Sequence, residues 1–154
     1  MNEIAVGALM TRNVVTVEPE TPFRTLVAVM TGHSVSAVPV VDGRGRPIGV
    51  VSEADLLAKQ EFHGGRDELP RHDRAGRDRW FRAQGRNAAE VMTTPVRVVH
   101  ADEPVSAAAR LLAQTGIRRL FVTSWNGRLI GVVSRGDLLR VYLRDDHSVT
   151  REEK

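Results

Sequence analysis

The sequence predicts an α/β (α+β) protein in which one β-α-β-β-α unit occurs twice. Three observations lead to this fold class: an ungapped internal repeat spans most of the chain, short β-branched runs alternate with runs of helical periodicity, and turn residues separate these runs at matching places in each half. A unit of about 50 residues buries too little surface to be comfortably stable alone. We therefore expect the two copies to pack with pseudo-two-fold symmetry, with two equivalent clefts at their junction.

The repeat aligns residues 10–57 with residues 92–139 at a constant offset of 82, and 16 of the 48 aligned positions are identical. Unrelated sequences would agree at roughly one position in fifteen. The longest shared run, Ile-Gly-Val-Val-Ser, occurs at residues 48–52 and again at residues 130–134. This similarity indicates a duplication, so both halves are expected to fold alike.

Each copy predicts a strand, a helix, two strands that form a hairpin, and a second helix. Pro22 fits the first turn of the first helix, Gly32 ends that helix, and an Asp-Gly-Arg-Gly turn at residues 42–45 closes the hairpin. In the first copy the elements are expected at residues 14–17, 22–32, 38–41, 47–51 and from residue 52 onward. In the second copy they are expected at residues 96–99, 104–114, 119–123, 128–133 and 135–144.

The segment between the copies, residues 60–86, is polar, rich in glycine and arginine, and without periodicity. It is predicted to be a surface excursion or a mobile linker, which only Trp80 and Phe81 are suited to hold in place. The expected organisation is a first copy with a short leading helix at residues 1–59, a charged linker at 60–86, a second copy at 87–146 and a polar tail at 147–154.

The formal charge of +3 lies entirely within residues 58–89, which carry eight basic and five acidic side chains. The remaining parts are balanced, which argues against a dedicated nucleic-acid-binding face. Contact with nucleic acid through the arginine-rich linker stays open as a lesser alternative.

Several function classes are excluded by composition. The chain has no cysteine, so disulfides, thiolate catalysis and cysteine-based zinc sites are ruled out. Its five histidines show no paired ligand spacing, and no phosphate-cradling loop, zinc-protease or nucleophile-elbow signature occurs. Neither a secretory signal nor an apolar run of membrane-spanning length is present. We expect a cytoplasmic protein that is not an enzyme, holds no metal and does not enter a membrane.

The repeated motifs resemble those of cystathionine-β-synthase (CBS) domains. The resemblance is carried by residues 48–57 and 130–139, by the Met-Thr pairs at residues 10 and 92, and by the Val-Pro-Val-Val-Asp run at residues 38–42. Paired CBS domains, called Bateman modules, commonly bind AMP, ATP or S-adenosylmethionine in clefts between the repeats, and many form dimers. The resemblance therefore implies a regulatory module with an adenosyl ligand, a homodimeric state and a regulated partner protein, and no required cofactor. The polar tail resembles the approach to a BON domain in bacterial relatives.

The resemblance also implies site residues. In the family's Gly-x-x-Ser/Thr-x-x-Asp motif the aspartate holds the ribose hydroxyls and the hydroxyl residue contacts ribose or phosphate, which points to Asp55 with Ser52 and to Asp137 with Ser134. A carboxylate at a helix start can accept hydrogen bonds from two vicinal hydroxyls, while the helix N-terminus favours an anion. The same Ser-x-x-Asp spacing also fits a capping box, which would make these residues structural.

Further candidates surround this motif. Arg118 and Arg119 occupy the place where the family often has a phosphate-binding basic residue. Adjacent strand residues point to opposite faces, so only one of them can reach the cleft, and Arg119 is the candidate. Arg135 is a second phosphate candidate, while Val50 and Val132 could flank an adenine or simply pack in the core. The first copy has Ser36-Ala37 where the second has the two arginines, so phosphate binding is expected to differ between the copies.

Overall fold

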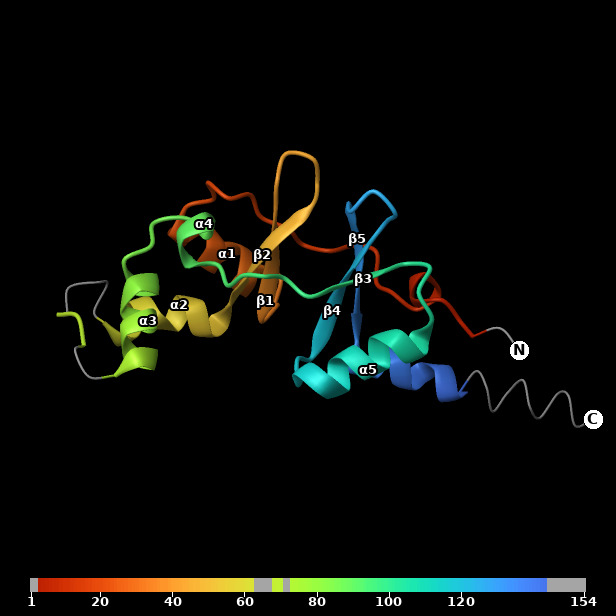
Figure 1. Ribbon diagram of the computed structural model, residues 1–154. Helices are drawn as coiled ribbons and strands as arrows, with labels where there is room; N and C mark the ends of the chain where they lie inside the picture. The colour runs from red at the N-terminus through yellow and green to blue at the C-terminus, as the bar shows by residue number, and fades with distance from the viewer. Residues whose placement is uncertain (1–2, 63–67, 71–72, 144–154) are drawn as a thin grey trace, which may run out of the picture. The chain divides into compact units, whose positions relative to one another are not determined.

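The computed structural model describes residues 3–62, 68–70 and 73–143. Its mixture of helices and small sheets confirms the predicted α/β class (Figure 1). The elements in chain order are η1 (Val6–Ala8), α1 (Phe23–Gly32), β1 (Ala37–Val41), β2 (Pro47–Ser52), α2 (Glu53–Glu61), α3 (Arg74–Ala83), α4 (Ala88–Val91), β3 (Val98–His100), α5 (Val105–Thr115), β4 (Arg119–Thr123) and β5 (Leu129–Ser134). A further helix covers residues 135–143.

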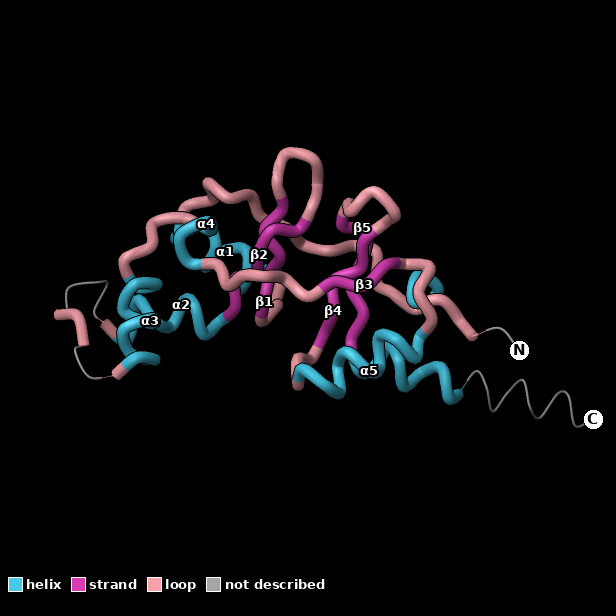
Figure 2. The backbone as a smooth tube through the Cα atoms, in the orientation of Figure 1, coloured by secondary structure: helices cyan, strands magenta, loops and turns pink. Residues whose placement is uncertain are grey.

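The chain forms two compact units. Unit 1 comprises residues 1–14 together with residues 97–154, and unit 2 comprises residues 15–96. Each unit has its own hydrophobic core, built from the strands of one repeat and the helices packed on them. Figure 2 shows one strand hairpin with its flanking helices in each unit.

Unit 2 contains an antiparallel hairpin in which Val38 of β1 pairs with Val51 of β2. The strand predicted at residues 14–17 does not form, and Val17 makes only an isolated parallel bridge with Val40. The amide of Val17 donates to the carbonyl of Pro39. Extending this ladder in either direction would require an amide from Pro39 or from Pro19, and proline has none.

Unit 1 contains a three-stranded sheet in the order β3-β4-β5, with β3 parallel to β4 and β5 antiparallel to it. Phe121 and Ala101 stand where the first repeat has prolines 39 and 19. Their amides donate to the carbonyls of Arg97 at 3.4 Å and Thr123 at 3.0 Å. The strand predicted at residues 96–99 therefore does form here, at Val98–His100.

The segment that leads into each repeat packs against the hairpin of the other repeat. We call residues 5–11 and 87–93 the lead segments. In unit 1, Thr11 and Val132 exchange backbone hydrogen bonds of 2.8 and 3.0 Å; in unit 2, Thr93 and Val50 exchange bonds of the same lengths. The compact units thus differ from the sequence repeats, because each lead segment pairs with the outer edge of a distant strand.

Part of the segment predicted to be a linker is helical. Helix α3 lies beside α2 in unit 2 (Figure 1). Its Ala83 is fully buried with Ala58 and Phe62 of the preceding segment, and Trp80 packs on this cluster as expected, whereas Phe81 is 55% exposed. The segment lacks clear apolar periodicity because the buried positions described in α3 are the small residues Gly76 and Ala83.

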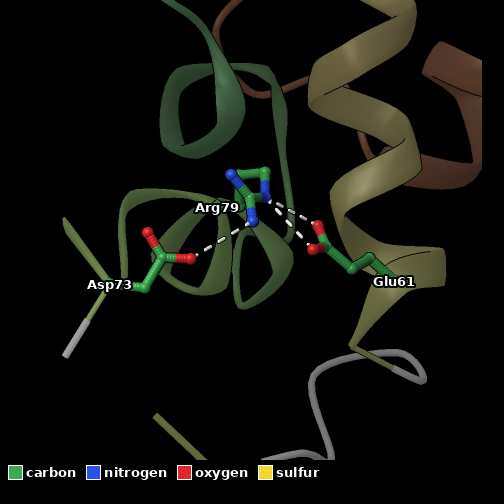
Figure 3. A network of polar contacts seen from close by, with 3 residues as sticks. All are labelled: Glu61, Asp73 and Arg79. Atoms are coloured by element: carbon green, nitrogen blue, oxygen red, sulfur yellow. Dashed lines mark hydrogen bonds and ion pairs between the residues drawn. The ribbon is translucent and has the colours of Figure 1, made fainter. Parts of the chain in front are cut away.

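Polar contacts also fasten α3 to α2. Arg79 binds both carboxylate oxygens of Glu61, at 3.1 and 2.9 Å, and lies 3.7 Å from Asp73 (Figure 3). The hydrogen bond to Glu61 raises the pKa of Arg79 above its ordinary value. Lys59 donates to the carbonyl of Ala83 at 2.9 Å, near the end of α3, where cations and unsatisfied carbonyls favour each other.

Candidate functional site

In unit 2, the Ser-x-x-Asp motif lies where β2 turns into α2. Ser52 is the N-cap of α2, and its hydroxyl accepts the Asp55 amide at 3.4 Å, while Oδ2 of Asp55 accepts the Ser52 amide at 2.8 Å and its hydroxyl at 3.0 Å. Oδ1 of Asp55 accepts a hydrogen bond from the Thr93 hydroxyl at 3.3 Å. The Asp55 side chain is consequently held on both oxygens and is only 1% exposed.

In unit 1, the second copy of the motif has the same local geometry. The Asp137 amide donates to the Ser134 hydroxyl at 3.2 Å, and Oδ2 of Asp137 accepts the Ser134 amide at 2.8 Å. Oδ1 faces a different partner, because the Arg140 guanidinium lies 2.8 Å away, one helical turn along. The Arg140 side chain is 71% exposed, whereas Asp137 is buried at 7% exposed, so the buried carboxylate is paired with a cation on the surface.

Both motifs make the contacts that the capping interpretation predicts. Each serine caps a helix and each aspartate closes back on the serine amide, which stabilises the strand-to-helix junction. Capping uses mainly Oδ2 of each aspartate, and the two units differ at Oδ1. The Arg140 side chain is largely exposed, so it can turn toward solvent when a ligand hydroxyl takes its place at Oδ1 of Asp137. Of the two carboxylates, Asp137 is accordingly the better suited to accept hydroxyl groups from a ligand.

Arg119 lies beside this junction in unit 1. It begins β4 and is the direct partner of Ser134 across the antiparallel ladder, so the two side chains project from the same face of the sheet. Arg119 is half-buried, whereas Arg118 precedes the strand and is exposed. In unit 2 the partner of Ser52 is Ala37, so the basic residue has no counterpart there.

The other candidate residues do not adjoin the Ser134–Asp137 pair as Arg119 does. Val50 and Val132 are half-buried, and their backbones form the bridges to Thr93 and Thr11 of the lead segments. Arg135 is exposed at the start of the helix at residues 135–143, where it lines a groove against α5. The structure thus brings Ser134, Asp137 and Arg119 together and directs Arg135 toward the groove.

Two partners of the motif were missed from the sequence. Thr93 belongs to the repeated Met-Thr pair, but nothing in the pattern links it to Asp55, 38 residues away. Arg140 could have been found, because oppositely charged residues three apart on a helix are neighbours.

Within the described ranges, no helix is both long and apolar enough to cross a bilayer, and no three acidic or histidine side chains gather as metal ligands.

Comparison with known proteins decides the family. The model of the CBS domain matches residues 6–61 and again residues 88–144, which together cover most of the chain. The chain belongs to the CBS domain family. The two matches correspond to a tandem CBS pair, as the internal repeat predicts.

Several proteins are similar to this CBS pair along most of its length. An uncharacterized protein of Methanopyrus kandleri is 31% identical over 142 residues, which are 92% of this chain and 64% of that protein. The chloroplastic CBS domain-containing protein CBSX2 of Arabidopsis thaliana is 30% identical over 90% of this chain and 63% of its own length. The chain thus spans somewhat less than two thirds of these two curated relatives.

Solved structures agree with the family and the fold. CBSX2 in complex with AMP matches with a TM-score of 0.73 and 30% identity, covering 93% of this chain and 98% of that one. A putative acetoin utilization protein of Vibrio cholerae matches with a TM-score of 0.70 at 24% identity, covering 99% of this chain and 98% of the other, which supports the fold alone.

Proposed function

We propose that this CBS pair is a non-catalytic regulatory module that binds an adenosyl ligand, with AMP or ATP as the first candidates and S-adenosylmethionine as a further member of the class. The observation that carries the proposal is the AMP complex of CBSX2, which is 30% identical over 93% of this chain. The repeated Ser-x-x-Asp helix starts supply the chemistry, because a carboxylate at a helix N-terminus can accept ribose hydroxyls beside an anion-favouring dipole.

The principal site of this proposal is in unit 1. Asp137 would accept the ribose hydroxyls once Arg140 moves away from Oδ1, and Arg119 would bind phosphate from the same face as Ser134. Unit 2 lacks such an arginine opposite Ser52, and Thr93 already contacts Oδ1 of Asp55. We therefore propose that a phosphorylated ligand binds through unit 1, with Asp55 serving chiefly to stabilise its helix start.

Regulation follows if the ligand binds one arrangement of the protein better than another. A ligand shifts a conformational equilibrium only by its differential affinity for the two states. The proposed module acts as a homodimer, and a partner protein senses the ligand-dependent change.

Calorimetric titration with AMP, ATP and S-adenosylmethionine tests the ligand. Asp137→Ala is expected to weaken AMP binding by about 1–3 kcal/mol, the range for losing a charge-assisted hydrogen bond. Asp102→Ala is the matched control, because it removes the same charge from an exposed turn of unit 1. Equal affinity of Asp137→Ala and the parent for AMP would refute the assigned role.

A second candidate function is a ligand-free dimeric scaffold, which the apolar grooves of both units favour. A thermal-shift panel separates the two candidates, because a ligand that binds only the folded state must raise its stability. A melting temperature unchanged by saturating nucleotide would favour the scaffold.

A further inference from the structure

In unit 1, Arg140 occupies one carboxylate oxygen of Asp137. Its guanidinium lies 2.8 Å from Oδ1, whereas Oδ2 of the same carboxylate accepts the Ser134 amide. Oδ1 is also the oxygen that the proposed function assigns to the ribose hydroxyls. A ligand that binds there must therefore displace a cation, and the free energy of the Asp137–Arg140 pair is lost when it does.

This pair joins a buried group to an exposed one. Asp137 is 7% exposed, so its carboxylate has lost most of its hydration, whereas the Arg140 side chain is 71% exposed. The arginine can turn toward water while its helix backbone stays in place. Its positive charge then remains near any ligand bound at Asp137, because dissolved salt screens charges only over a distance of about 10 Å.

The equivalent position of unit 2 is alanine. Ala58 is the repeat equivalent of Arg140, and it is buried with Phe62 and Ala83 where α3 packs on α2. In this unit the hydroxyl of Thr93 donates to Oδ1 of Asp55. The two equivalent carboxylates thus differ, because a guanidinium binds Oδ1 in unit 1 and a neutral hydroxyl binds it in unit 2.

Two further arginines distinguish the unit 1 motif. Arg119 is the ladder partner of Ser134, and Arg135 is the first residue of the helix that follows. Their repeat equivalents in unit 2 are Ala37 and Glu53. An anionic ligand in unit 1 would be attracted by these cations, whereas a neutral or cationic one would displace Arg140 without that gain. The charge of unit 1 therefore favours nucleotides over adenosine, and over S-adenosylmethionine, whose sulfonium and ammonium groups outnumber its carboxylate.

We propose that Arg140 is a specificity-determining residue, which closes Asp137 to neutral and cationic adenosyl compounds and admits anionic nucleotides. In the free protein its guanidinium pairs with Oδ1. When a nucleotide binds, the ribose hydroxyls take Oδ1 and the displaced guanidinium faces solvent, where its charge attracts the phosphate. The inference rests on the proposed function, because it needs an adenosyl ligand at Asp137, and it adds ligand charge as the property that unit 1 selects.

NMR titration with adenosine and with AMP tests this role, read at the Ser134 amide so that binding in unit 1 is measured. Arg140→Gln removes the charge and keeps a polar side chain. Adenosine should bind this variant about fivefold more tightly than it binds the parent, the upper range for losing an exposed ion pair. AMP affinity should change little, because the relief at Oδ1 is offset by the lost attraction. The preference for AMP over adenosine should thus fall about fivefold, and S-adenosylmethionine should gain affinity as adenosine does.

Two further variants separate charge from structure. Arg140→Lys keeps the charge and should retain most of the parent's preference for AMP. Arg110→Gln removes the same charge from an exposed position of α5 in unit 1 and should leave both affinities unchanged. General destabilisation would lower both affinities alike, so the ratio of the two affinities isolates the effect of charge.

Salt gives an independent measurement of the ion pair. Raising the salt concentration from about 50 to about 500 mM should tighten adenosine binding to the parent, because the competing Arg140 pair is screened, and should leave binding to Arg140→Gln unchanged. An AMP-to-adenosine ratio that is the same in the parent and in Arg140→Gln would overturn the inference while AMP binding stands. Failure of the parent to bind AMP would instead refute the proposed function, and the inference with it.

Discussion

The side chain of Met92 lies directly over Gly49. A methyl group built on Gly49 would come within 2.4 Å of the Met92 sulfur, and one built on Gly131 would come within 2.5 Å of the Met10 sulfur. Each repeated methionine thus rests on the repeated glycine of the opposite repeat. This contact seats the lead segments against β2 and β5, next to the Ser-x-x-Asp helix starts.

Alanine at these glycines should destabilise the fold. We expect Gly49→Ala and Gly131→Ala to lower the free energy of unfolding by about 1–3 kcal/mol, the usual cost of overpacking. Gly131→Ala should cost more, because its new methyl group also lies 2.9 Å from the rigid backbone carbonyl oxygen of Thr11. Urea unfolding measures both values.

Gly43→Ala is the control for this pair, because nothing lies within 4 Å of a methyl group at that position. The double variant Gly49→Ala with Met92→Ala should lose less free energy of unfolding than the two single variants lose together, because removing the Met92 side chain removes the clash. Strict additivity in this double-mutant cycle would show that the methionine does not seat on the glycine.

The two capping serines should differ in their contribution to stability. Ser52→Ala removes the helix cap and a hydrogen bond to buried Asp55, so we expect a loss of about 2 kcal/mol. Ser134→Ala should cost about 1 kcal/mol, because Asp137 keeps its ion pair with Arg140. Thermal and urea unfolding provide the values, and Ser52→Thr, which keeps the hydroxyl, should recover most of the stability. The reverse order of costs would contradict the contacts described.

Asp42 should contribute pH-dependent stability. The backbone amide of Arg46, followed by that of Arg44, donates to its carboxylate in the β1–β2 turn and holds the pKa of Asp42 below its ordinary value. Because the folded pKa lies below the unfolded one, this stabilisation is present above the unfolded value of about 3.9 and is lost as the pH falls through the folded pKa. Asp42→Asn should therefore be less stable than the parent at pH 7, with the difference shrinking below about pH 4. A constant difference across this range in urea unfolding would show that Asp42 does not titrate in this way.

Apolar packing should hold α3 more firmly than its ion pairs do. Phe62→Ala is expected to weaken the attachment of α3 by about 3 kcal/mol, because this ring packs with Ala58 and Ala83. Arg79→Ala should cost less than about 1 kcal/mol, since the Arg79 and Glu61 side chains are about 40% exposed. Hydrogen exchange of the α3 amides compares the two variants, and a larger effect of Arg79→Ala would reverse this ranking.

The sequence predicted the hairpins, the capped helices and their order, because these depend on local periodicity and turn chemistry. It did not predict that each lead segment packs against the hairpin of the other repeat. Both lead segments carry the same Met-Thr pair and both hairpins carry the same Ile-Gly-Val-Val-Ser run, so the sequence does not distinguish the two possible pairings. The strand predicted at residues 14–17 does not form. The sequence already holds the reason, because Pro19 and Pro39 have no amide to extend the ladder. The predictions for the tail at residues 147–154 concern residues outside those described.

The two Ser-x-x-Asp motifs could be located from the sequence, but the contacts that hold each aspartate could not. The spacing of Ser52 with Asp55 and of Ser134 with Asp137 indicated both a ligand contact and a capping box, and only the structure shows how far capping occupies the carboxylates. The difference between the units depends on Thr93, brought close by folding, and on Arg140, whose pairing with Asp137 was detectable from helical spacing.

An adenosyl ligand is proposed to bind at the Ser134–Asp137 helix start of unit 1. Titration of AMP into ¹⁵N-labelled protein, followed by NMR, locates the bound ligand residue by residue. Binding at this helix start should give saturable shifts that are largest at the amides of Ser134, Asp137 and Arg119. An unchanged spectrum at saturating AMP, or shifts confined to residues remote from this junction, would contradict it.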